Sequence, residues 1–208
     1  LLLEKNYQVY GLLRRSSLNT TTRIAHLLGD IILLSGDLGD QSSLDGAIEE
    51  SQPDEIYHLG GLSHVQISWT QPEVTANITG LGTLRMLEAM RKYAPRAKFY
   101  NAASSEMFGK VQTVPQNEHT RFYPRSPYAA AKVFGFEITR NYRESYALFA
   151  SSGICFNHEC LAANSPLLLR DPEKGFITIR RIADIVPLRE KGKTVQTFAT
   201  LSLRREEL

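Results

Sequence analysis

The chain has 208 residues, of which 42% are apolar, and a formal net charge of +2. This length predicts one large domain with enough core for a stable globular fold. The weak, scattered positive charge argues against a nucleic-acid partner, and no apolar stretch approaches the length of a membrane span. Cys155 and Cys160 form no metal or redox motif, so a reduced, cytoplasmic protein is the default expectation.

Strands and helices are expected to alternate along the chain. Strands are expected at residues 8–13, 31–35, 55–59, 99–103, 148–156 and 195–199. Helices are expected at 40–51, 72–93, 126–146 and 176–189, with one or two helical turns at 23–28. Because the strands are mostly continuous apolar runs, they predict a parallel sheet covered by helices on both faces. Such sheets bind ligands beyond the carboxyl ends of their strands, so the polar clusters that follow strands are the candidate site.

Four side chains in the middle of the chain form the candidate catalytic group. Tyr128 and Lys132 lie four residues apart, so on a helix they share one face, where the ammonium favours a phenolate that can act as a base. Ser104 and Glu106 follow the expected strand at 99–103. Ser104 would hydrogen-bond the hydroxyl being oxidised, and Glu106 would make a second proton transfer. The alternatives are a surface Tyr–Lys pair, a capping serine and a solvated glutamate.

A basic loop follows the first expected strand. It contains Arg14, Arg15, Ser16 and Ser17, at the place where a dinucleotide-binding fold contacts the adenosine ribose. Arginines there would accommodate a 2′-phosphate, which favours NADP over NAD. The alternative is an exposed basic pair with no ligand.

Two further loops complete the candidate cofactor site. Asp37 could bind the adenine amino group or could cap the next helix. Gly60 and Gly61 permit close approach of a ligand, although a plain turn uses glycine too. The candidate cofactor residues of these loops are Asp37, Leu38, Leu59, Gly60, Gly61 and Ser63. His58 is expected to be structural or on the surface, and the histidines are not spaced as a metal site, so no metal is expected.

These motifs resemble those of a known family. The chain is similar to the extended short-chain dehydrogenase/reductases and, within them, to the GDP-mannose 4,6-dehydratases, from Leu1 to about Glu159. The matching segments are residues 14–17, 36–38, 52–57, 63–65, 82–85, 122–128 and 157–159. Ser105, where the related dTDP-glucose dehydratases carry an Asp, favours the GDP-mannose branch.

The resemblance implies a fold and a domain organisation. The expected class is α/β, a Rossmann-like doubly wound parallel sheet with helices on both faces. Its first strand and glycine-rich loop are expected before Leu1, and the substrate domain is expected to be only partly present. Residues 1–159 would form the NADP-binding domain, and 160–208 a partial, divergent start of the substrate-binding region. The chain is therefore interpreted as a fragment, expected to be inactive alone.

The resemblance also implies a reaction. Tyr128 would take the proton of the sugar 4-hydroxyl, Lys132 would hold the ribose and tune Tyr128, and Ser104 would orient the 4-oxygen. Glu106 would remove the C5 proton so that water leaves from C6. His158 and the loop at 59–63 would line the NADP site, the substrate would be GDP-mannose or a related nucleotide sugar, and the full-length protein would be a homo-oligomer.

Departures from the family pattern leave alternatives open. The family's Ser-Pro-Arg-Arg-Gly is replaced here by residues 160–164, Cys-Leu-Ala-Ala-Asn, which removes an arginine pair. The alternatives are another NADP-dependent nucleotide-sugar epimerase or dehydratase, and an inactive truncated homologue that retains only the cofactor fold.

Overall fold

The computed structural model describes residues 1–17, 21–156, 166–170 and 177–181. The chain divides into two compact units, Leu1–Ile154 and Cys155–Leu208. The first contains every candidate site residue except His158, which lies outside the described residues. The assignment of 1–159 to the cofactor and of 160–208 to the substrate stays a prediction.

The first unit contains two separate sheets. In one, β1 (Val9–Leu13) pairs in parallel with β2 (Ile31–Ser35). In the other, β4 (Lys98–Ser104) lies between β3 (Glu55–His58) and β5 (Phe149–Cys155), and β3 runs parallel to β4. The strands expected at 8–13, 31–35, 55–59, 99–103 and 148–156 are thus all present, with no end shifted by more than one residue.

The division into two sheets has a topological explanation. The Rossmann strand order is 3-2-1-4-5-6, in which strand 1 separates strand 2 from strand 4. If β1 is strand 2 and β3 is strand 4 of that order, both are neighbours of a strand that the described residues do not supply. The α/β architecture with parallel strands is Rossmann-like, as predicted, but its two sheet segments are not joined.

The main helices begin where the sequence provides caps. Asp40 accepts a hydrogen bond from the Ser42 amide at the start of α1 (Gln41–Ser51), and Ser126 accepts one from the Ala129 amide at the start of α5 (Pro127–Tyr146). The helix expected at 72–93 is composite. It comprises α3 (Pro72–Thr75), a π-helix η3 (Ala76–Leu81) and α4 (Gly82–Tyr93).

Four shorter elements complete the first unit. They are the helix α2 (Val65–Thr70) and the 3-10 turns η1 (Leu3–Lys5), η2 (Thr22–Leu27) and η4 (Ser105–Met107). η2 corresponds to the helical turns expected at 23–28, and η4 follows β4 directly at the candidate catalytic group.

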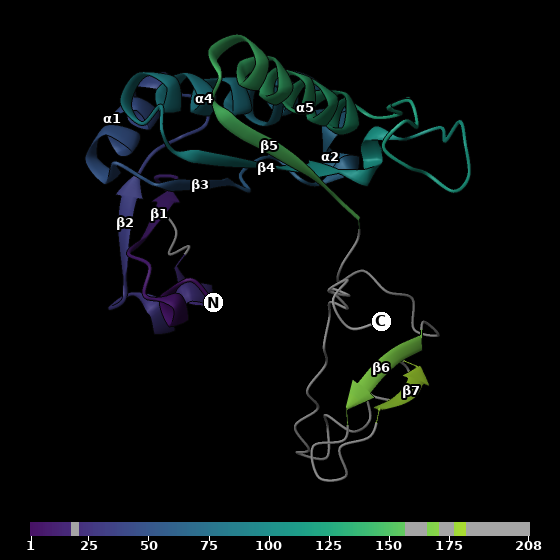
Figure 1. The fold of residues 1–208 in the computed structure, drawn as a ribbon, viewed down its shortest axis with the longest axis horizontal. Coiled ribbons are helices and arrows are strands. Elements are labelled where there is room, and N and C mark those ends of the chain that lie inside the picture. The colour runs from purple at the N-terminus through teal and green to yellow at the C-terminus, as the bar shows by residue number, and fades with distance from the viewer. Residues whose placement is uncertain (18–20, 157–165, 171–176, 182–208) are drawn as a thin grey trace. The chain divides into compact units, whose positions relative to one another are not determined.

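The core lies on one face of the three-stranded sheet. Ile56 and His58 of β3 and Phe99 of β4 are buried, whereas the intervening Tyr57 is 50% exposed. Figure 1 shows α1, α4 and α5 above this sheet, on the side that the buried residues face. Helices on both faces were expected, but in the described part of the chain they cover only one face of this sheet. The core side chains include Leu44, Ile48, Met86, Leu87, Met90 and Tyr142.

In the second unit the described residues form an antiparallel pair, β6 (Pro166–Arg170) with β7 (Ile177–Arg181). The predicted helix at 176–189 is therefore wrong over β7. Ile177, Thr178 and Ile179 are β-branched, a composition that favours a strand over a helix. The expected strand at 195–199 lies outside the described residues.

Candidate active site

The candidate catalytic residues meet where β4 ends and α5 begins. Lys132 donates a hydrogen bond from Nζ to the Ala102 carbonyl of β4, at 2.7 Å. Two residues further along, Ser104 caps η4, and its Oγ accepts a hydrogen bond from the Glu106 amide at 3.2 Å. The strand that leads to Ser104 and Glu106 is therefore joined directly to the helix that carries Tyr128 and Lys132. The joining contact is the hydrogen bond from the Lys132 side chain to the backbone of β4.

Tyr128 and Lys132 are both buried, with exposures of 8% and 9%. The Nζ of Lys132 lies 5.9 Å from the centre of the Tyr128 ring. An exposed surface pair, the alternative interpretation, is thereby excluded. The Lys132 ammonium thus lies beside the Tyr128 ring, and its effect on the phenol stays a prediction.

Ser104 and Glu106 have more open surroundings. Ser104 is half-buried and is a turn-capping residue, as its alternative interpretation held. In this role the Ser104 Oγ is an acceptor, so the hydroxyl proton of Ser104 can still be donated to a ligand. Glu106 is exposed. A base that acts on a bound substrate must be accessible, but a solvated glutamate without a role is exposed as well. Their catalytic roles stay predictions.

Small residues let α5 approach the helix that precedes α4. A Cβ on Gly80 would lie 3.4 Å from the Phe134 ring, and one on Gly135 would lie 3.1 Å from Thr83 Oγ1. Both glycines are buried at the contact of α5 with η3 and α4. This close packing fixes the helix that carries Tyr128 and Lys132.

His58, expected to be structural or on the surface, is buried behind this site. Its Nε2 lies 3.1 Å from Thr83 Oγ1, and the Thr83 hydroxyl donates its one proton to the Thr79 carbonyl. With the Thr83 proton directed to that carbonyl, His58 is the donor, through Nε2. Burial, and secondarily the charge of Lys132, lower the pKa of His58 to about 4. The imidazole is thus a neutral neighbour of Lys132 at physiological pH.

The basic loop is accessible. Arg14, Arg15, Ser16 and Ser17 follow β1 and are all exposed. Their side chains are therefore open to a ligand at the carboxyl end of the strand, although a solvated basic pair would look the same. Their role in holding a cofactor stays a prediction.

The loop after β2 is ordered by hydrogen bonds of its own. Asp37 accepts from the Gly39 amide through Oδ1, at 2.7 Å, and its amide donates to Ser43 Oγ at 3.0 Å. The cap of α1 is Asp40, so the alternative in which Asp37 caps the helix is wrong. The Asp37 carboxylate is instead held in a tight turn beyond the strand.

The glycine loop after β3 lies against this turn. A Cβ on Gly60 would come within 2.9 Å of Leu38 Cδ1, and Gly61 has φ +154°, a conformation that favours glycine. The next amide, that of Leu62, donates to Thr79 Oγ1 at 3.0 Å. Leu59 and Ser63, which flank the glycines, are exposed. A backbone without side chains at this place is suited to close approach by a flat or anionic ligand.

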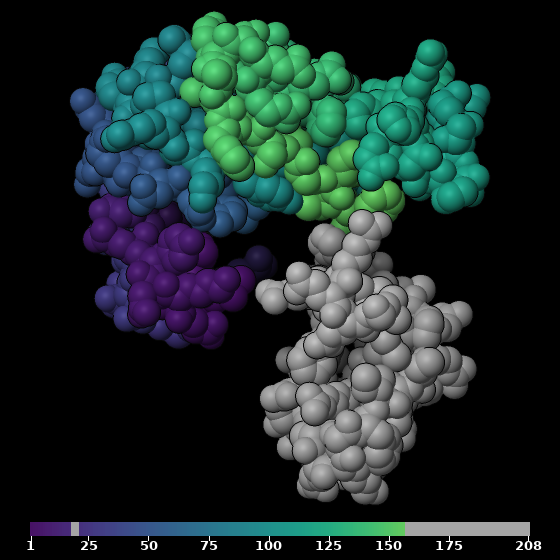
Figure 2. All heavy atoms as spheres, in the orientation of Figure 1, coloured from purple at the N-terminus to yellow at the C-terminus, as the bar shows by residue number. Residues whose placement is uncertain are grey.

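A long loop borders the site between η4 and α5. Figure 2 shows it as a teal lobe at the edge of the first unit. Its base is closed by the Lys110 amide, which donates a hydrogen bond to the Tyr123 carbonyl, and Phe122 is inserted between Phe108 and Phe136.

Within the described residues, no group of three or more His, Cys, Asp or Glu side chains could hold a metal ion. Likewise, no described helix is long and apolar enough to cross a membrane.

Comparison with known proteins identifies the family. Residues 1–171 match the sequence profile of the family described as GDP-mannose 4,6 dehydratase. The chain belongs to the GDP-mannose 4,6-dehydratase family. This confirms the resemblance inferred from the motifs.

Several GDP-mannose 4,6-dehydratases are similar to the chain. The protein from Vibrio cholerae serotype O1 is 48% identical over 187 residues, which cover 86% of this chain and 50% of that protein. The Homo sapiens protein is 50% identical over 168 residues, covering 76% of this chain and 45% of that protein. The chain therefore spans about half the length of the curated relatives it matches.

Solved structures share the fold. Thermus thermophilus UDP-glucose 4-epimerase, in complex with NAD, is 27% identical with a TM-score of 0.61, covering 71% of this chain and 46% of that one. Pseudomonas aeruginosa RMD, complexed with NADPH, is 23% identical with a TM-score of 0.57, covering 72% and 55%. The chain thus shares the fold of these two solved structures.

Proposed function

We propose that this chain carries the catalytic and cofactor-binding half of an NADP-dependent GDP-mannose 4,6-dehydratase. The observation that carries the proposal is the buried Tyr128–Lys132 pair, tied by Lys132 to the Ala102 carbonyl beside Ser104 and Glu106. The names of the relatives support GDP-mannose as the substrate and a 4,6-dehydration as the reaction. We expect the product to be GDP-4-keto-6-deoxymannose.

In this proposal each residue has one task. Tyr128 accepts the proton of the sugar 4-hydroxyl, and Ser104 donates a hydrogen bond to the 4-oxygen. Glu106 then removes the proton from C5 and passes it to the C6 hydroxyl, which leaves as water. C5 regains a proton when C6 is reduced, and the proton that Tyr128 took from the 4-hydroxyl balances it. A nicotinamide bound beside these residues would supply the redox chemistry at C4 and C6, with no net oxidation. Lys132 holds the positive charge that favours the Tyr128 phenolate.

NADP rather than NAD is favoured by the exposed Arg14 and Arg15. A guanidinium presents a planar fork of donors that suits a 2′-phosphate, whereas NAD-binding folds place a carboxylate near that point. The turn at Asp37 and the glycines at 60 and 61 would receive the adenine and the backbone of the dinucleotide. Solved relatives of this fold bind either cofactor, with NAD in one and NADPH in another.

The remaining parts of the proposal concern the whole protein. A GDP-sugar is its substrate partner, it assembles as a homo-oligomer when full length, and it is cytoplasmic. The last point is supported by the sequence of Cys155 and Cys160, which matches no metal or redox motif. His158, expected at the cofactor, lies outside the described residues.

The catalytic roles of Tyr128 and Glu106 are tested in a protein that contains these residues and has the full length of the curated relatives. With GDP-mannose and NADP, the Tyr128→Phe variant is expected to lower kcat by about a hundredfold or more, the usual range for loss of a general base. Glu106→Gln is expected to retain oxidation at C4 but to block loss of water, so that reduced cofactor accumulates and is seen by its absorbance. Full dehydration by either variant would contradict the assigned role.

Cofactor choice is tested separately by titration. The wild-type protein is expected to bind NADP more tightly than NAD, and the Arg14→Ala/Arg15→Ala double variant is expected to lose that preference. Arg23→Ala, a change in an exposed arginine of η2, is the control and should leave the preference intact. Equal affinity of the wild type for NAD and NADP would count against the proposal.

A further inference from the structure

We infer that Arg85 is a positioning residue, which locks the turn at residues 36–39 to the π-helix η3 and so sets the adenosine end of the cofactor site. The sequence pattern singled out the turn and its neighbours but not this side chain. The inference deepens the proposed function and rests on it for the identity of the ligand.

Arg85 bridges two segments that are distant in sequence. Its Nη1 donates to the Leu38 carbonyl at 2.8 Å and to the Asn77 carbonyl at 3.1 Å, and its Nη2 donates to Asn77 Oδ1 at 2.8 Å. The Arg85 carbonyl in turn accepts from Gln41 Nε2 of α1 at 3.0 Å. One residue thereby connects the turn, the π-helix and the first turn of α1.

The turn that Arg85 holds also packs closely against neighbouring segments. The Leu38 side chain is received by two glycines, since a Cβ on Gly60 would lie 2.9 Å from Leu38 Cδ1 and one on Gly82 would lie 3.0 Å from Leu38 Cβ. Gly39 lies close to the π-helix in the same way, since a Cβ there would lie 3.3 Å from Ile78 Cδ1. Movement of the turn would therefore shift the glycine loop at 60 and 61 as well.

The π-helix presents to Arg85 a carbonyl that also closes its own wide turn. In η3 the Gly82 amide bonds to the Asn77 carbonyl, five residues back, and that carbonyl also accepts from Arg85. π-helical turns are rare and are often found at functional sites. Both Asn77 and Arg85 are half-buried, so these bonds are partly shielded from water.

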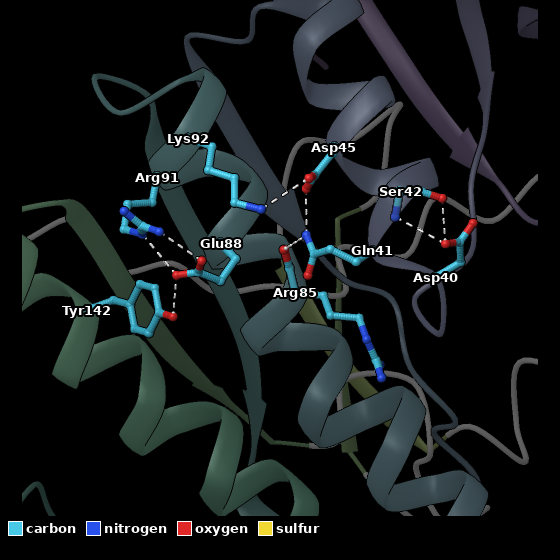
Figure 3. A network of polar contacts seen from close by, with 9 residues as sticks. All are labelled: Asp40, Gln41, Ser42, Asp45, Arg85, Glu88, Arg91, Lys92 and Tyr142. Atoms are coloured by element: carbon cyan, nitrogen blue, oxygen red, sulfur yellow. Dashed lines mark hydrogen bonds and ion pairs between the residues drawn. The ribbon is translucent and has the colours of Figure 1, made fainter.

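Lysine could not replace this arginine. A guanidinium holds several donors in a rigid plane and can serve Leu38 and Asn77 together, whereas an ammonium is a point charge on a flexible stem. Arg91, also on α4, is a matched comparison: its guanidinium makes two bonds of 2.9 Å to Glu88 and takes no part in the turn. In Figure 3 the Arg85 guanidinium points away from the cluster that Arg91 forms with Glu88 and Tyr142.

The first test needs no ligand. Amide hydrogen exchange is measured for the wild-type chain, Arg85→Lys and Arg91→Lys, at the protected amides of Asp37, Gly39 and Asp40. Arg85→Lys is expected to speed their exchange by about tenfold, the effect of losing one charge-assisted hydrogen bond. Arg91→Lys should leave these three amides unchanged. Equal exchange in the wild type and Arg85→Lys, or equal acceleration in both variants, would overturn the inference.

A second variant covers the case in which Arg85→Lys fails to fold. Asn77→Ala removes only the Oδ1 acceptor and leaves the bond from Arg85 to Leu38 in place. It is expected to accelerate exchange at the same amides by a smaller factor, with the amides of β4 unaffected. Protection equal to that of the wild type would contradict the bridge.

The second test uses ligand affinity. NADPH and reduced nicotinamide mononucleotide, which lacks the adenosine half, are titrated against the wild type and Arg85→Lys. The variant is expected to bind NADPH about tenfold more weakly and the mononucleotide unchanged, a split that general destabilisation would not produce. Equal weakening of both ligands would show a merely structural role. If the wild type binds no NADPH, the proposed function fails, and the exchange experiment still decides the role of Arg85.

Discussion

At the scale of single residues, His58 is the clearest case of a side chain whose state is set by its surroundings. Its ring stacks on Phe99, with centroids 5.9 Å apart, and its Nε2 proton is committed to Thr83. Protonation would place a second cation near Lys132 in a site with little water. The fold therefore retains the neutral imidazole.

This has a consequence for stability below neutral pH. The pKa of His58 is about 4 in the folded chain against 6.5 for the ordinary side chain, so between these values the unfolded chain binds a proton that the folded chain does not. Stability is fully present above pH 6.5 and falls as the pH drops toward 4. Between pH 6.5 and 5 the wild type is expected to lose about 2 kcal/mol through this group.

The measurement is urea denaturation of the wild type and His58→Gln at several pH values. Glutamine can donate to Thr83 but does not titrate, so the variant should have lower stability at pH 7 and a flatter dependence on pH. The same slope in both proteins would show that other groups cause the acid sensitivity.

The sequence predicts some of these residues and not others, for physical reasons. Tyr128 and Lys132 are found because four residues of helix bring them to one face. His58 and Arg85 are not, because their partners come from other elements. The contact between Arg85 and Leu38 spans 47 residues and depends on tertiary packing, which a local pattern does not contain.

At the scale of elements, α4 and α5 are joined by a polar cluster shown in Figure 3. Glu88 accepts from Arg91 on its own helix and from the Tyr142 hydroxyl of α5, at 2.6 Å. Hydrogen bonding to Arg91 is the main cause that lowers the pKa of Glu88 to about 2; burial opposes this shift, and the hydrogen bond from Tyr142 adds to it. The cluster thus holds the ionised carboxylate between the two helices.

Because the pKa of Glu88 is depressed in the folded state, the ionised carboxylate stabilises the fold. This contribution to the free energy of unfolding is present above pH 4.5 and is lost as the pH falls toward 2. The Glu88→Gln variant is expected to be less stable than the wild type at pH 7 by about 1 kcal/mol, a modest value because the pair is partly exposed. The difference should shrink below pH 4.5. Denaturation at pH 7 and pH 3 checks this, and a constant difference would contradict it.

A glycine controls the loop between η4 and α5. Gly109 has φ +48°, and a Cβ there would collide with the Tyr123 carbonyl oxygen, a backbone atom that closes the loop. Gly109→Ala is expected to destabilise the chain by about 2 kcal/mol and to speed cleavage of this loop by protease. Gly46→Ala in α1, where a Cβ meets nothing within 4 Å, is the control. It should stabilise the chain by about 0.5–1 kcal/mol, and equal effects of the two changes would refute the argument.

The helix expected at 72–93 shows where a periodic pattern stops being informative. Ile78, Leu81, Leu84 and Leu87 recur at threes and correctly predict a long helical segment. The same spacing does not reveal that residues 76–81 form a π-helix, or that Leu81 at its end is 41% exposed. Thr79 and Asn77 accept hydrogen bonds from Leu62 and Arg85, and such contacts are not contained in the sequence period.

At the scale of the whole first unit, the face of the three-stranded sheet opposite the helices is not covered by described elements. Tyr57, Tyr100 and Phe149 lie on it, with Tyr57 50% and Phe149 64% exposed. Tyr57 and Tyr100 contact each other, with ring centroids 6.4 Å apart, and Gly153 of β5 adjoins the Tyr100 hydroxyl. An exposed apolar face of this kind promotes association.

The chain is therefore expected to bind a hydrophobic dye such as ANS while folded. Phe149→Thr should lower dye binding, with a change in stability of no more than about 0.5 kcal/mol because the side chain is largely exposed. Val114→Thr, at an 89% exposed position of the loop between η4 and α5, is the control and should retain the dye signal. The test compares dye fluorescence with circular dichroism, and an unchanged signal in Phe149→Thr would contradict the assignment.

The helix α2 gives the chain a built-in optical label. It follows directly from His64, whose Nδ1 accepts a hydrogen bond from the Ile67 amide, and so continues the loop that contains Gly61 and Ser63. It carries Trp69, the single tryptophan of the sequence, with 58% of its surface exposed. The indole emission of this protein therefore comes from one place beside the candidate cofactor loop, and its colour and intensity report on that loop without any dye or tag.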